Sequence, residues 1–382
     1  MSRNLRIIHC LRAPVGGLFR HVVDLALEQS YLGHEVGILY DPALETDAVA
    51  EQMNLLKQHC RLGVRTAPMA RLLSYKDFLA FRSLRCFAGE TQAQILHGHG
   101  AKGGAYARLA ASQLSRQAKR ERGPRVLGFY TPHGGSLHFN PKQLSGRLFL
   151  GLEKKLARYT NGLIFESRYS AGIYQDLIGG GFCSSRVIPN GLKPEEFVPI
   201  APDEGAADFV FVGELRQLKG VDVLLRALND LRERHKGVRL AIVGDGPDMG
   251  EFQTLSRSLG LEAQVTFHGR LSTRKALALG RAIVVPSRAE SFPYIVLEAG
   301  AAQVPLIATD VGGISEITAD SGVHLLPAED VAALADTMGQ VLTDKGRYQA
   351  LARQLSEIIA SKFTVEMMTA GVTDFYLSVL RP

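Results

Sequence analysis

Residues 188–215, IPNGLKPEEFVPIAPDEGAADFVFVGEL, separate two series of predicted strands and helices. Within them, 191–207 holds three prolines and several acids, a composition typical of a linker. The apolar run DFVFVGEL (208–215) then predicts a strand, and an amphipathic helix is expected at 221–235. A chain of 382 residues is also too long for one typical core. The sequence therefore predicts two domains.

On both sides of this linker, apolar strands alternate with amphipathic helices. Such alternation indicates parallel sheets covered by helices on both faces. We predict an α/β fold with two Rossmann-like, doubly wound domains, 1–190 and 191–363, that face each other across a cleft. The segment 364–382 is expected to form a final helix that packs back on the N-terminal domain. Strands are expected at 5–11, 35–40, 93–99, 125–133, 162–167 and 186–191, and after the linker at 208–215, 239–246, 264–270, 282–287 and 305–310.

Charge is unevenly distributed along the chain. Residues 1–190 carry 25 lysines and arginines against 13 acids, a net charge of +12, whereas residues 191–382 carry 19 against 25, a net charge of −6. A basic half suggests an anionic partner such as lipid headgroups or a phosphorylated acceptor, and a merely solvated surface is the alternative. Nucleic acid is disfavoured because the chain has no tryptophan and no interleaved aromatic and basic residues.

Cysteine spacing and hydropathy bear on the compartment. The four cysteines show no paired or metal-like spacing, which favours a reduced, cytoplasmic location. The sequence shows no signal peptide and no run of about 18 apolar residues that would span a membrane. A peripheral position on the inner face of a membrane is compatible with the basic first half.

The stretch 141–159 predicts a helix with leucines at every fourth position, among basic residues. A basic loop, RQAKRERGPR (116–125), precedes it. One interpretation is an interfacial helix with a polybasic patch that contacts anionic membrane. The other is a helix whose leucines pack on the sheet. The leucines are Leu144, Leu148, Leu152 and Leu156.

The stretch AESFPYIVLEAG (289–300) places two glutamates eight positions apart. Pro293 suits the first turn of a helix, because the N–H that it lacks would be unpaired there anyway. Glu290 then lies in the loop after a strand, and Glu298 lies one to two turns into the helix. Glu298 could accept hydrogen bonds from ribose hydroxyls, and Glu290 could contact a group beyond a phosphate.

The start of this helix is a candidate anion site. The backbone N–H groups of Tyr294, Ile295 and Val296 are expected at the positive end of the helix dipole, where a diphosphate would bind. Acids that only cap the helix are the structural alternative.

Two further loops carry residues suited to phosphate. VGELRQLKGVDVLL (212–225) places Arg216 and Lys219 between a strand and a helix, and both cations suit phosphate oxygens, although they could simply be solvated. APVGGLFRH (13–21) places Gly16 and Gly17 where backbone could approach a ligand closely. Neither domain contains the G-x-G-x-x-G dinucleotide fingerprint.

Histidines end two of the predicted strands. His133, in TPHGG, is expected at the ligand edge of the first domain, where a neutral imidazole could bind a hydroxyl group or orient an acceptor. His97 and His99, in LHGHG, could be a metal pair, but no third ligand with convincing spacing follows. No D-x-D sequence is present to hold a divalent ion on a diphosphate. We therefore expect no metal.

Taken together, these motifs resemble those of the retaining glycosyltransferases of family 4, which have the GT-B fold. The most specific element, ESFPYIVLE, matches the family's E-x7-E motif at Glu290 and Glu298. GGLFRH matches its Gly-rich loop, TPHGG its acceptor-side histidine loop and IPNG the end of the first domain. GELRQLKG matches the loop that holds the donor diphosphate, and TDVGG matches a later donor-side loop. The resemblance covers essentially the whole chain.

The resemblance implies a UDP- or GDP-sugar donor bound mainly by the C-terminal domain. It implies transfer of a hexose-type sugar, with retention, to a saccharide or lipid-linked acceptor in the synthesis of a cell-surface polysaccharide or lipopolysaccharide, with no cofactor. By position, Lys219 would contact the diphosphate, Glu298 the ribose and Glu290 the donor sugar. His133 would lie near the reacting centre, and Gly17 would let its loop approach the phosphate.

The chain departs from the family pattern at one position. Many relatives have an arginine after the glycine of the diphosphate loop, and here that residue is Glu214, so Arg216 is expected to supply the cation. Three alternatives remain open at this point. They are a nucleotide-sugar epimerase or hydrolase, a non-catalytic nucleotide-sugar-binding module, and a dinucleotide-dependent oxidoreductase, which the missing fingerprint disfavours.

Overall fold

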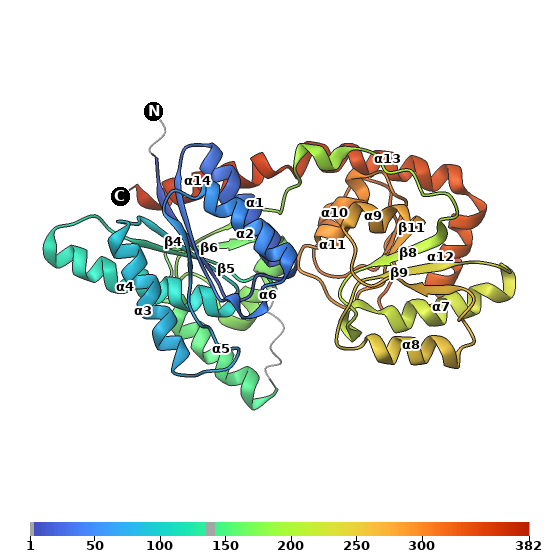
Figure 1. Cartoon of the computed structure of the whole chain (residues 1–382), viewed down its shortest axis with the longest axis horizontal. Coiled ribbons are helices and arrows are strands. Elements are labelled where there is room, and N and C mark those ends of the chain that lie inside the picture. The colour runs from blue at the N-terminus through green and yellow to red at the C-terminus, as the bar shows by residue number, and fades with distance from the viewer. Residues whose placement is uncertain (1–3, 135–141, 382) are drawn as a thin grey trace. The chain divides into compact units, whose positions relative to one another are not determined.

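The computed structural model describes residues 4–134 and 142–381, and the chain divides into two compact units (Figure 1). The first unit consists of Met1–Asn190 together with Val365–Pro382, and the second of Gly191–Thr364. Each unit is built on its own parallel sheet.

The first unit contains a seven-stranded sheet in the order β3-β2-β1-β4-β5-β6-β7, and every neighbouring pair is parallel. Chain order reverses next to β1, which lies between β2 and β4. The strands are β1 (Arg6–Leu11), β2 (Glu35–Tyr40), β3 (Gly63–Thr66), β4 (Ile95–His99), β5 (Leu127–Thr131), β6 (Gly162–Phe165) and β7 (Ser184–Val187).

Helices cover both faces of this sheet. On one face α1, α2 and α14 pack against alternate strand residues, and on the other α3, α4, α5 and α6 pack against the remainder. Successive residues of a strand point to opposite faces of the sheet and therefore belong to separate apolar clusters. The helices are α1 (Gly16–Tyr31), α2 (Asp47–His59), α3 (Lys76–Glu90), α4 (Gly100–Glu121), α5 (Leu144–Ala157), α6 (Arg168–Ile178) and α14 (Val365–Leu380), with a short 3-10 turn η1 (Pro42–Leu44).

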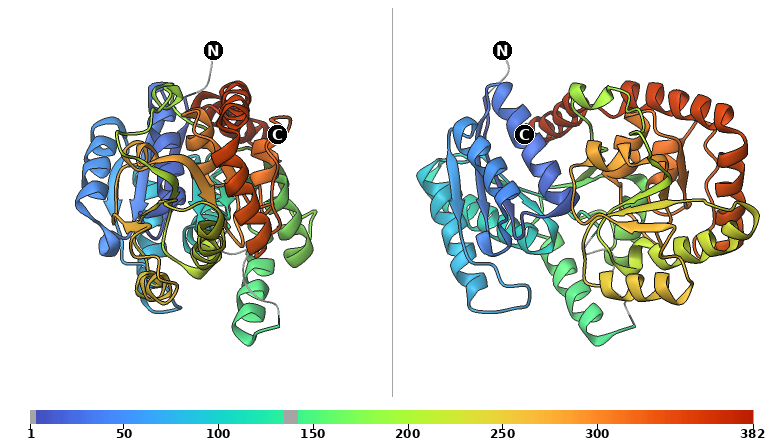
Figure 2. Two further views of the ribbon diagram at one scale, coloured as in Figure 1. Left: turned by 90° about the vertical axis from the view of Figure 1, so that its right-hand side faces the viewer. Right: turned by 45° about the vertical axis from the view of Figure 1, so that its right-hand side comes forward.

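The second unit contains a five-stranded parallel sheet in the order β10-β9-β8-β11-β12. Helices α7, α8 and α12 pack on one face, and α9, α10 and α13 pack on the other (Figure 2). The strands are β8 (Ala207–Val212), β9 (Leu240–Val243), β10 (Val265–Phe267), β11 (Gly280–Val285) and β12 (Leu306–Ala308). The helices are α7 (Val221–Arg234), α8 (Met249–Ser258), α9 (Thr273–Ala278), α10 (Tyr294–Ala301), α11 (Ile314–Thr318), α12 (Val331–Thr343) and α13 (Lys345–Lys362), with 3-10 turns η2 (Pro194–Phe197) and η3 (Gln217–Lys219).

The structure confirms two doubly wound α/β units, and it adds an edge strand that the sequence did not indicate. Strand β3 has four residues, GVRT, which are half-buried or exposed, so it lacks the apolar run that marks the other strands. The stretch 191–207 is also not a free linker. Leu192 is fully buried in the core of the second unit, and the Ile200 N–H donates to Ala302 O at 3.0 Å.

Helix α5 is rotated relative to the expected leucine face. Among the residues of α5 whose burial the structure describes, which leave out Leu144, the buried ones are Gly146, Leu150, Glu153 and Ala157, whereas Leu148 is 55% exposed. The expectation that the leucines pack on the sheet is therefore wrong for Leu148. On the buried side of α5, Glu153 faces α4 and forms an ion pair with Arg108, which is fully buried. Across the described residues no helix is both long enough and apolar enough to cross a bilayer.

Candidate functional site

In each unit, the reversal of strand order places two loops at the carboxyl edge of the sheet, where open α/β sheets bind ligands. In the second unit these loops follow β8 and β11. Lys219 ends the first loop and Glu290 lies in the second. Lys219 Nζ lies 2.6 Å from Glu290 Oε1, and the Ser287 hydroxyl donates to the same oxygen at 2.7 Å. A cation and a carboxylate 71 residues apart in sequence thus meet at the point where a ligand is expected.

Both carboxylate and cation are partly withdrawn from water. The side chain of Glu290 is 9% exposed and that of Lys219 is 25% exposed. The pair therefore retains access to a ligand, while Ser287 and the surrounding backbone fix its position.

Two glycines let these loops pack against one another. Gly220 has φ +69°, and a Cβ placed there would lie 1.9 Å from the Pro286 carbonyl oxygen. Gly312, in the loop after β12, has φ +62°, and its Cβ would lie 2.0 Å from the Glu290 carbonyl oxygen. Any side chain at either position would displace the loop that carries Glu290.

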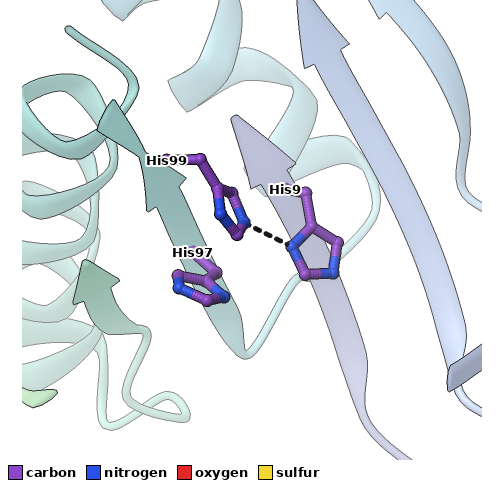
Figure 3. A group of neighbouring side chains, drawn as sticks. All are labelled: His9, His97 and His99. Atoms are coloured by element: carbon purple, nitrogen blue, oxygen red, sulfur yellow. Dashed lines mark hydrogen bonds between the residues drawn. The ribbon is translucent and has the colours of Figure 1, made fainter. Parts of the chain in front are cut away.

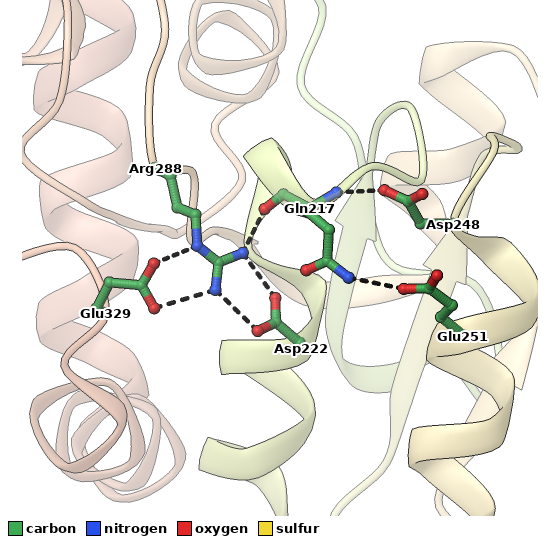
Figure 4. Close-up of polar contacts among 6 residues, drawn as sticks. All are labelled: Gln217, Asp222, Asp248, Glu251, Arg288 and Glu329. Atoms are coloured by element: carbon green, nitrogen blue, oxygen red, sulfur yellow. Dashed lines mark hydrogen bonds and ion pairs between the residues drawn. The ribbon is translucent and has the colours of Figure 1, made fainter. Parts of the chain in front are cut away.

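Arg288 ties the two loops together, and the sequence did not single it out. Its guanidinium donates to both carboxylate oxygens of Asp222 at 2.8 Å, and it also contacts the Gln217 carbonyl oxygen and the carboxylate of Glu329 (Figure 4). Burial alone would raise the pKa of Asp222, but the hydrogen bonds and charge of Arg288 outweigh burial and hold that pKa below its usual value. Two carboxylates neutralise Arg288, so its role is to hold the loops.

The same part of the β8 loop is also held by two acids at the start of α8. Asp248 Oδ2 accepts from the Gln217 backbone N–H at 2.7 Å, and Glu251 Oε2 accepts from the Gln217 side-chain amide at 3.0 Å (Figure 4). Lys219 is therefore presented from a loop anchored on both sides.

Arg216 has a different environment. Its side chain is 50% exposed and lies 3.5 Å from Glu214, which is 54% exposed. Glu214 stands where the resembled motif has arginine, and Arg216 is the residue expected to supply the cation in its place. These two residues thus form an ion pair with each other. Exposed pairs of this kind are weak, so Arg216 remains able to turn toward a ligand.

The start of α10 differs from the expectation in two respects. Pro293 is the residue before the helix, with φ −74° and ψ 122°, and does not lie in its first turn. The Val296 N–H donates to Pro293 O at 3.2 Å, so the expectation that this amide faces an anion is wrong. Tyr294 and Val296 are buried and Ile295 is half-buried. Glu298 is half-buried in the second turn of the helix.

In the first unit, the reversal of strand order lies between β1 and β4, and histidines gather there. His133, just after β5, is 3% exposed. Its Nδ1 lies 2.8 Å from Glu166 Oε1, and its Nε2 lies 2.9 Å from His99 Nδ1. Burial alone would raise the pKa of Glu166, but the charge and hydrogen bond of His133 outweigh burial and lower it to about 2. Because both ring nitrogens of His133 are engaged, an acceptor hydroxyl would have to displace one of these contacts.

The hydrogen bonds continue from His133 into the sheet. His99 Nε2 lies 3.0 Å from His9 Nδ1, and His9 Nε2 lies 2.9 Å from Gln29 Oε1. Figure 3 shows His9 on β1 beside His99 and His97 on β4. Burial lowers the pKa of His9 to about 4 and holds the pKa of His99 well below its usual value, so both rings stay neutral near pH 7.

Two more histidines complete this histidine cluster, which we define as His9, His21, His97, His99 and His133. His97 Nε2 lies 2.8 Å from Thr131 Oγ1, and its Nδ1 lies 2.6 Å from the Tyr376 hydroxyl. His21, on α1, has its Nδ1 2.9 Å from Asn190 Oδ1. The sequence pointed only to His97, His99 and His133. His21 lies four residues after the Gly-Gly pair, in a helix that follows a strand-end loop. That position was the sequence feature that could have indicated a site residue.

Gly17 lies in the first turn of α1 and is exposed, directly after Gly16 with φ +62°. A Cβ placed at Gly16 would meet nothing within 4 Å.

Comparisons with known proteins agree with this architecture. Residues 15–196 match the family described as "Glycosyltransferase Family 4", and residues 206–344 match "Glycosyl transferases group 1". The chain is 31% identical over 280 residues to the putative glycosyltransferase EpsD of Bacillus subtilis, covering 70% of this chain and 72% of EpsD. The chain therefore belongs to the group 1 glycosyltransferases.

Other relatives match over shorter stretches or in fold alone. A glycogen synthase of Mycobacterium tuberculosis is 32% identical over 237 residues, which span 60% of this chain and 57% of that protein. Anabaena HepE, solved with UDP and glucose, superimposes with a TM-score of 0.79 over 98% of this chain and all of its own, at 18% identity. These likenesses confirm the GT-B fold expected from the sequence.

Proposed function

We propose that this chain is a glycosyltransferase that moves a hexose-type sugar from a nucleotide sugar to a saccharide or lipid-linked acceptor. The observation that carries the proposal is the Lys219–Glu290 pair, 2.6 Å apart, where the strand order of the second sheet reverses. A lysine suits the charge of a diphosphate, and a carboxylate accepts hydrogen bonds from sugar hydroxyls. A nucleotide sugar has both groups adjacent to each other.

The donor is bound by the second unit in this proposal. Lys219 and Arg216 contact the diphosphate, Tyr294 and Ile295 offer backbone at the start of α10, and Glu298 accepts from the ribose hydroxyls. UDP is the first nucleotide to test, because the HepE structures with the same fold contain UDP and UDP-glucose. GDP is the second.

Transfer with retention of configuration is proposed from the E-x7-E motif. The developing negative charge falls on the leaving diphosphate, which Lys219 stabilises, and the diphosphate in turn helps to deprotonate the acceptor. Nuclear magnetic resonance of the first-formed product, with a donor of known anomeric configuration, tests this directly. A product of inverted configuration would overturn it.

A thermal-shift panel of UDP, GDP, ADP, NAD and nucleotide sugars tests the donor. A ligand at 100 times its Kd adds about 2.7 kcal/mol to the free energy of unfolding of the unit that binds it. We expect a shift with UDP or GDP compounds that is lost in Lys219→Ala and in Glu298→Ala. Arg234→Ala is the matched control, because its exposed pair with Asp336 lies on the outside of α7. A shift with NAD alone, or with no nucleotide, would contradict the proposal.

Nucleotide release with and without acceptor separates the remaining alternatives. A transferase releases UDP faster when a saccharide or lipid-linked acceptor is added. If the donor is consumed equally fast without acceptor, the chain is a hydrolase or an epimerase. Binding without any consumption would indicate a non-catalytic module.

A lipid-linked acceptor on the inner face of a membrane is proposed from the surface of the first unit. Leu148 is 55% exposed on α5, and the neighbouring Arg147, Lys154 and Lys155 are exposed. Sedimentation with vesicles of anionic phospholipid should show binding at low salt. Neutralising the basic residues of 119–125 should weaken it, whereas an equal number of changes on α13 should not. If the protein does not bind the vesicles at low salt, the proposed membrane contact is wrong.

A further inference from the structure

We propose that the first unit holds a divalent transition-metal ion, with Zn²⁺ as the representative ion, on His21, His99 and His133. One ring nitrogen from each of these three histidines lies within 4.8 Å of the other two. They come from three elements at the carboxyl edge of one sheet: α1, the last residue of β4, and the residue two beyond the end of β5. Imidazole is a preferred ligand of Zn²⁺, and three histidines form a known ligand set for it.

The second nitrogen of each ring already has a hydrogen-bond partner. His133 Nδ1 lies 2.8 Å from Glu166, His21 Nδ1 lies 2.9 Å from Asn190, and His99 Nε2 lies 3.0 Å from His9. Metal-bound histidines almost always donate their other ring N–H to such a partner, which fixes the tautomer and the orientation of the ring. The arrangement around this triad is the one that a metal site needs, including a carboxylate behind one ligand.

His21 provides an independent indication. Its Nε2 is buried and has no hydrogen-bond partner among the described residues, and the residue is 1% exposed. With Nδ1–H donated to Asn190, this nitrogen carries a lone pair without a donor, a costly state in a buried position. A metal ion would satisfy it. His21 also packs against His133, with ring centroids 4.8 Å apart.

The hydrogen-bond count along the chain of rings leaves room for a metal ion. His133, His99 and His9 make four hydrogen bonds between Glu166 and Gln29. Three neutral imidazoles bring three N–H groups, so the fourth hydrogen comes from a protonated ring or from the Gln29 amide nitrogen, which is unpartnered within the part of the chain that the structure describes and faces His9 when the amide is turned over. A metal ion bound to both His99 Nδ1 and His133 Nε2 would replace the hydrogen bond between these two atoms and leave the other three in place. A protonated ring and a turned Gln29 amide are the competing explanations.

The distance between two of the three ligand nitrogens needs only a small adjustment. His99 Nδ1 and His133 Nε2 are 2.9 Å apart, whereas two nitrogens bound to tetrahedral Zn²⁺ at about 2.0–2.1 Å lie about 3.4 Å from each other. Three protein ligands leave a fourth position for water or for a hydroxyl group of a ligand of the first unit. The neighbouring group His9, His97 and His99 (Figure 3) is less suitable, because both nitrogens of His97 contact groups outside that trio, the Thr131 and Tyr376 hydroxyls.

Isothermal titration of EDTA-treated, dialysed full-length protein with Zn²⁺ tests the proposal. We expect one ion per chain, and at least a 100-fold loss of affinity in His21→Gln and in His133→Gln. Glu166→Gln should weaken binding 10- to 100-fold, the effect of removing a partner behind a ligand. Substituting Co²⁺ should give the visible absorption of a tetrahedral site.

Two controls test whether a loss of binding is specific to this site and whether each variant is folded. His324→Gln removes an exposed histidine of the second unit and should leave binding unchanged. Circular dichroism and melting of each variant should show that it is folded. The absence of stoichiometric binding in the folded parent protein would overturn the proposal, and so would binding that survives both His21→Gln and His133→Gln. The donor assay is independent, because its ligands bind the second unit.

Discussion

At the scale of single residues, the Lys219–Glu290 pair has an unusual consequence. In the absence of a ligand the lysine is neutralised by a carboxylate 2.6 Å away, so a diphosphate must compete with Glu290 for the same ammonium group. The two residues are therefore coupled, and removing one changes what the other can do.

Glu290→Gln separates binding from chemistry. We expect the affinity for free UDP to be unchanged or higher, because the competing charge is gone, whereas kcat should fall about 100- to 1,000-fold if the carboxylate acts on the donor sugar in the transition state. Titration calorimetry gives the first quantity and steady-state kinetics gives the second. Lys219→Ala should instead weaken UDP binding. Equal weakening of UDP by both substitutions would show that the pair acts only as a structural unit.

At the scale of secondary-structure elements, loop contacts and helix orientation depend on a few special positions. Gly312 permits the loop after β12 to touch the Glu290 backbone, and Arg108 with Glu153 sets the rotation of α5 on α4. Neither contact is visible in the periodicity of the sequence, because each joins segments that are far apart along the chain.

Gly312→Ala should reduce the activity of the enzyme more strongly than it reduces the stability of the fold. The added Cβ would lie 2.0 Å from the Glu290 carbonyl oxygen, and φ +62° is itself unfavourable for alanine. We expect at least a tenfold loss of kcat/KM and a lower Tm. Gly250→Ala in α8 is the matched control, since its Cβ meets nothing within 4 Å and alanine favours a helix. Full activity in Gly312→Ala would show that the Glu290 loop tolerates displacement.

Glu153→Gln should destabilise the first unit by about 3–5 kcal/mol, because it leaves a buried arginine without its counter-charge. Arg108 is fully buried, donates to both oxygens of Glu153 at 2.6 and 2.9 Å, and lies over the Tyr130 ring. Urea unfolding measures the loss. Asp336→Asn removes the acid of an exposed pair, 60% exposed, and should cost less than about 1 kcal/mol. Comparable losses in the two variants would contradict this account.

At the scale of the whole molecule, the two units differ in how they should respond to acid. Burial lowers the pKa of His9 from 6.5 to about 4 and that of His21 to about 3, and it holds the pKa values of His97 and His99 well below 6.5. All four belong to the first unit. As pH falls below 6.5, these histidines gain protons in the unfolded chain before they do in the folded one, so the folded state is disfavoured.

The first unit should therefore lose stability as pH falls from about 6.5 to about 4, by on the order of 3 kcal/mol for His9 alone. Glu166, with its pKa lowered to about 2, adds a loss in the same direction between about pH 4.5 and 2. Amide exchange of EDTA-treated protein at pH 7.5 and 5.5, compared at matched intrinsic rates, reports the two units separately. We expect protection to fall first in the first unit. Loss of protection in the second unit alone would contradict the assignment.

The amino-acid sequence by itself determined the class of fold and most of the secondary structure. Alternating apolar strands and amphipathic helices are local patterns, and they indicated two parallel sheets before any contact was known. The E-x7-E spacing, Lys219 and the histidine loop are also local, and they carried the family resemblance that the comparisons confirm. The short polar strand β3 and the rotation of α5 were not predicted, because they depend on neighbours contributed by other parts of the chain.

Only the tertiary structure decided which side chains meet. Lys219 and Glu290 become partners because β8 and β11 are adjacent in the sheet, although 71 residues separate the pair. His21, His99 and His133 converge because the sheet and α1 bring three distant segments to one edge. Strand order is set by the packing of whole helices and strands against each other, and no window of sequence contains that information.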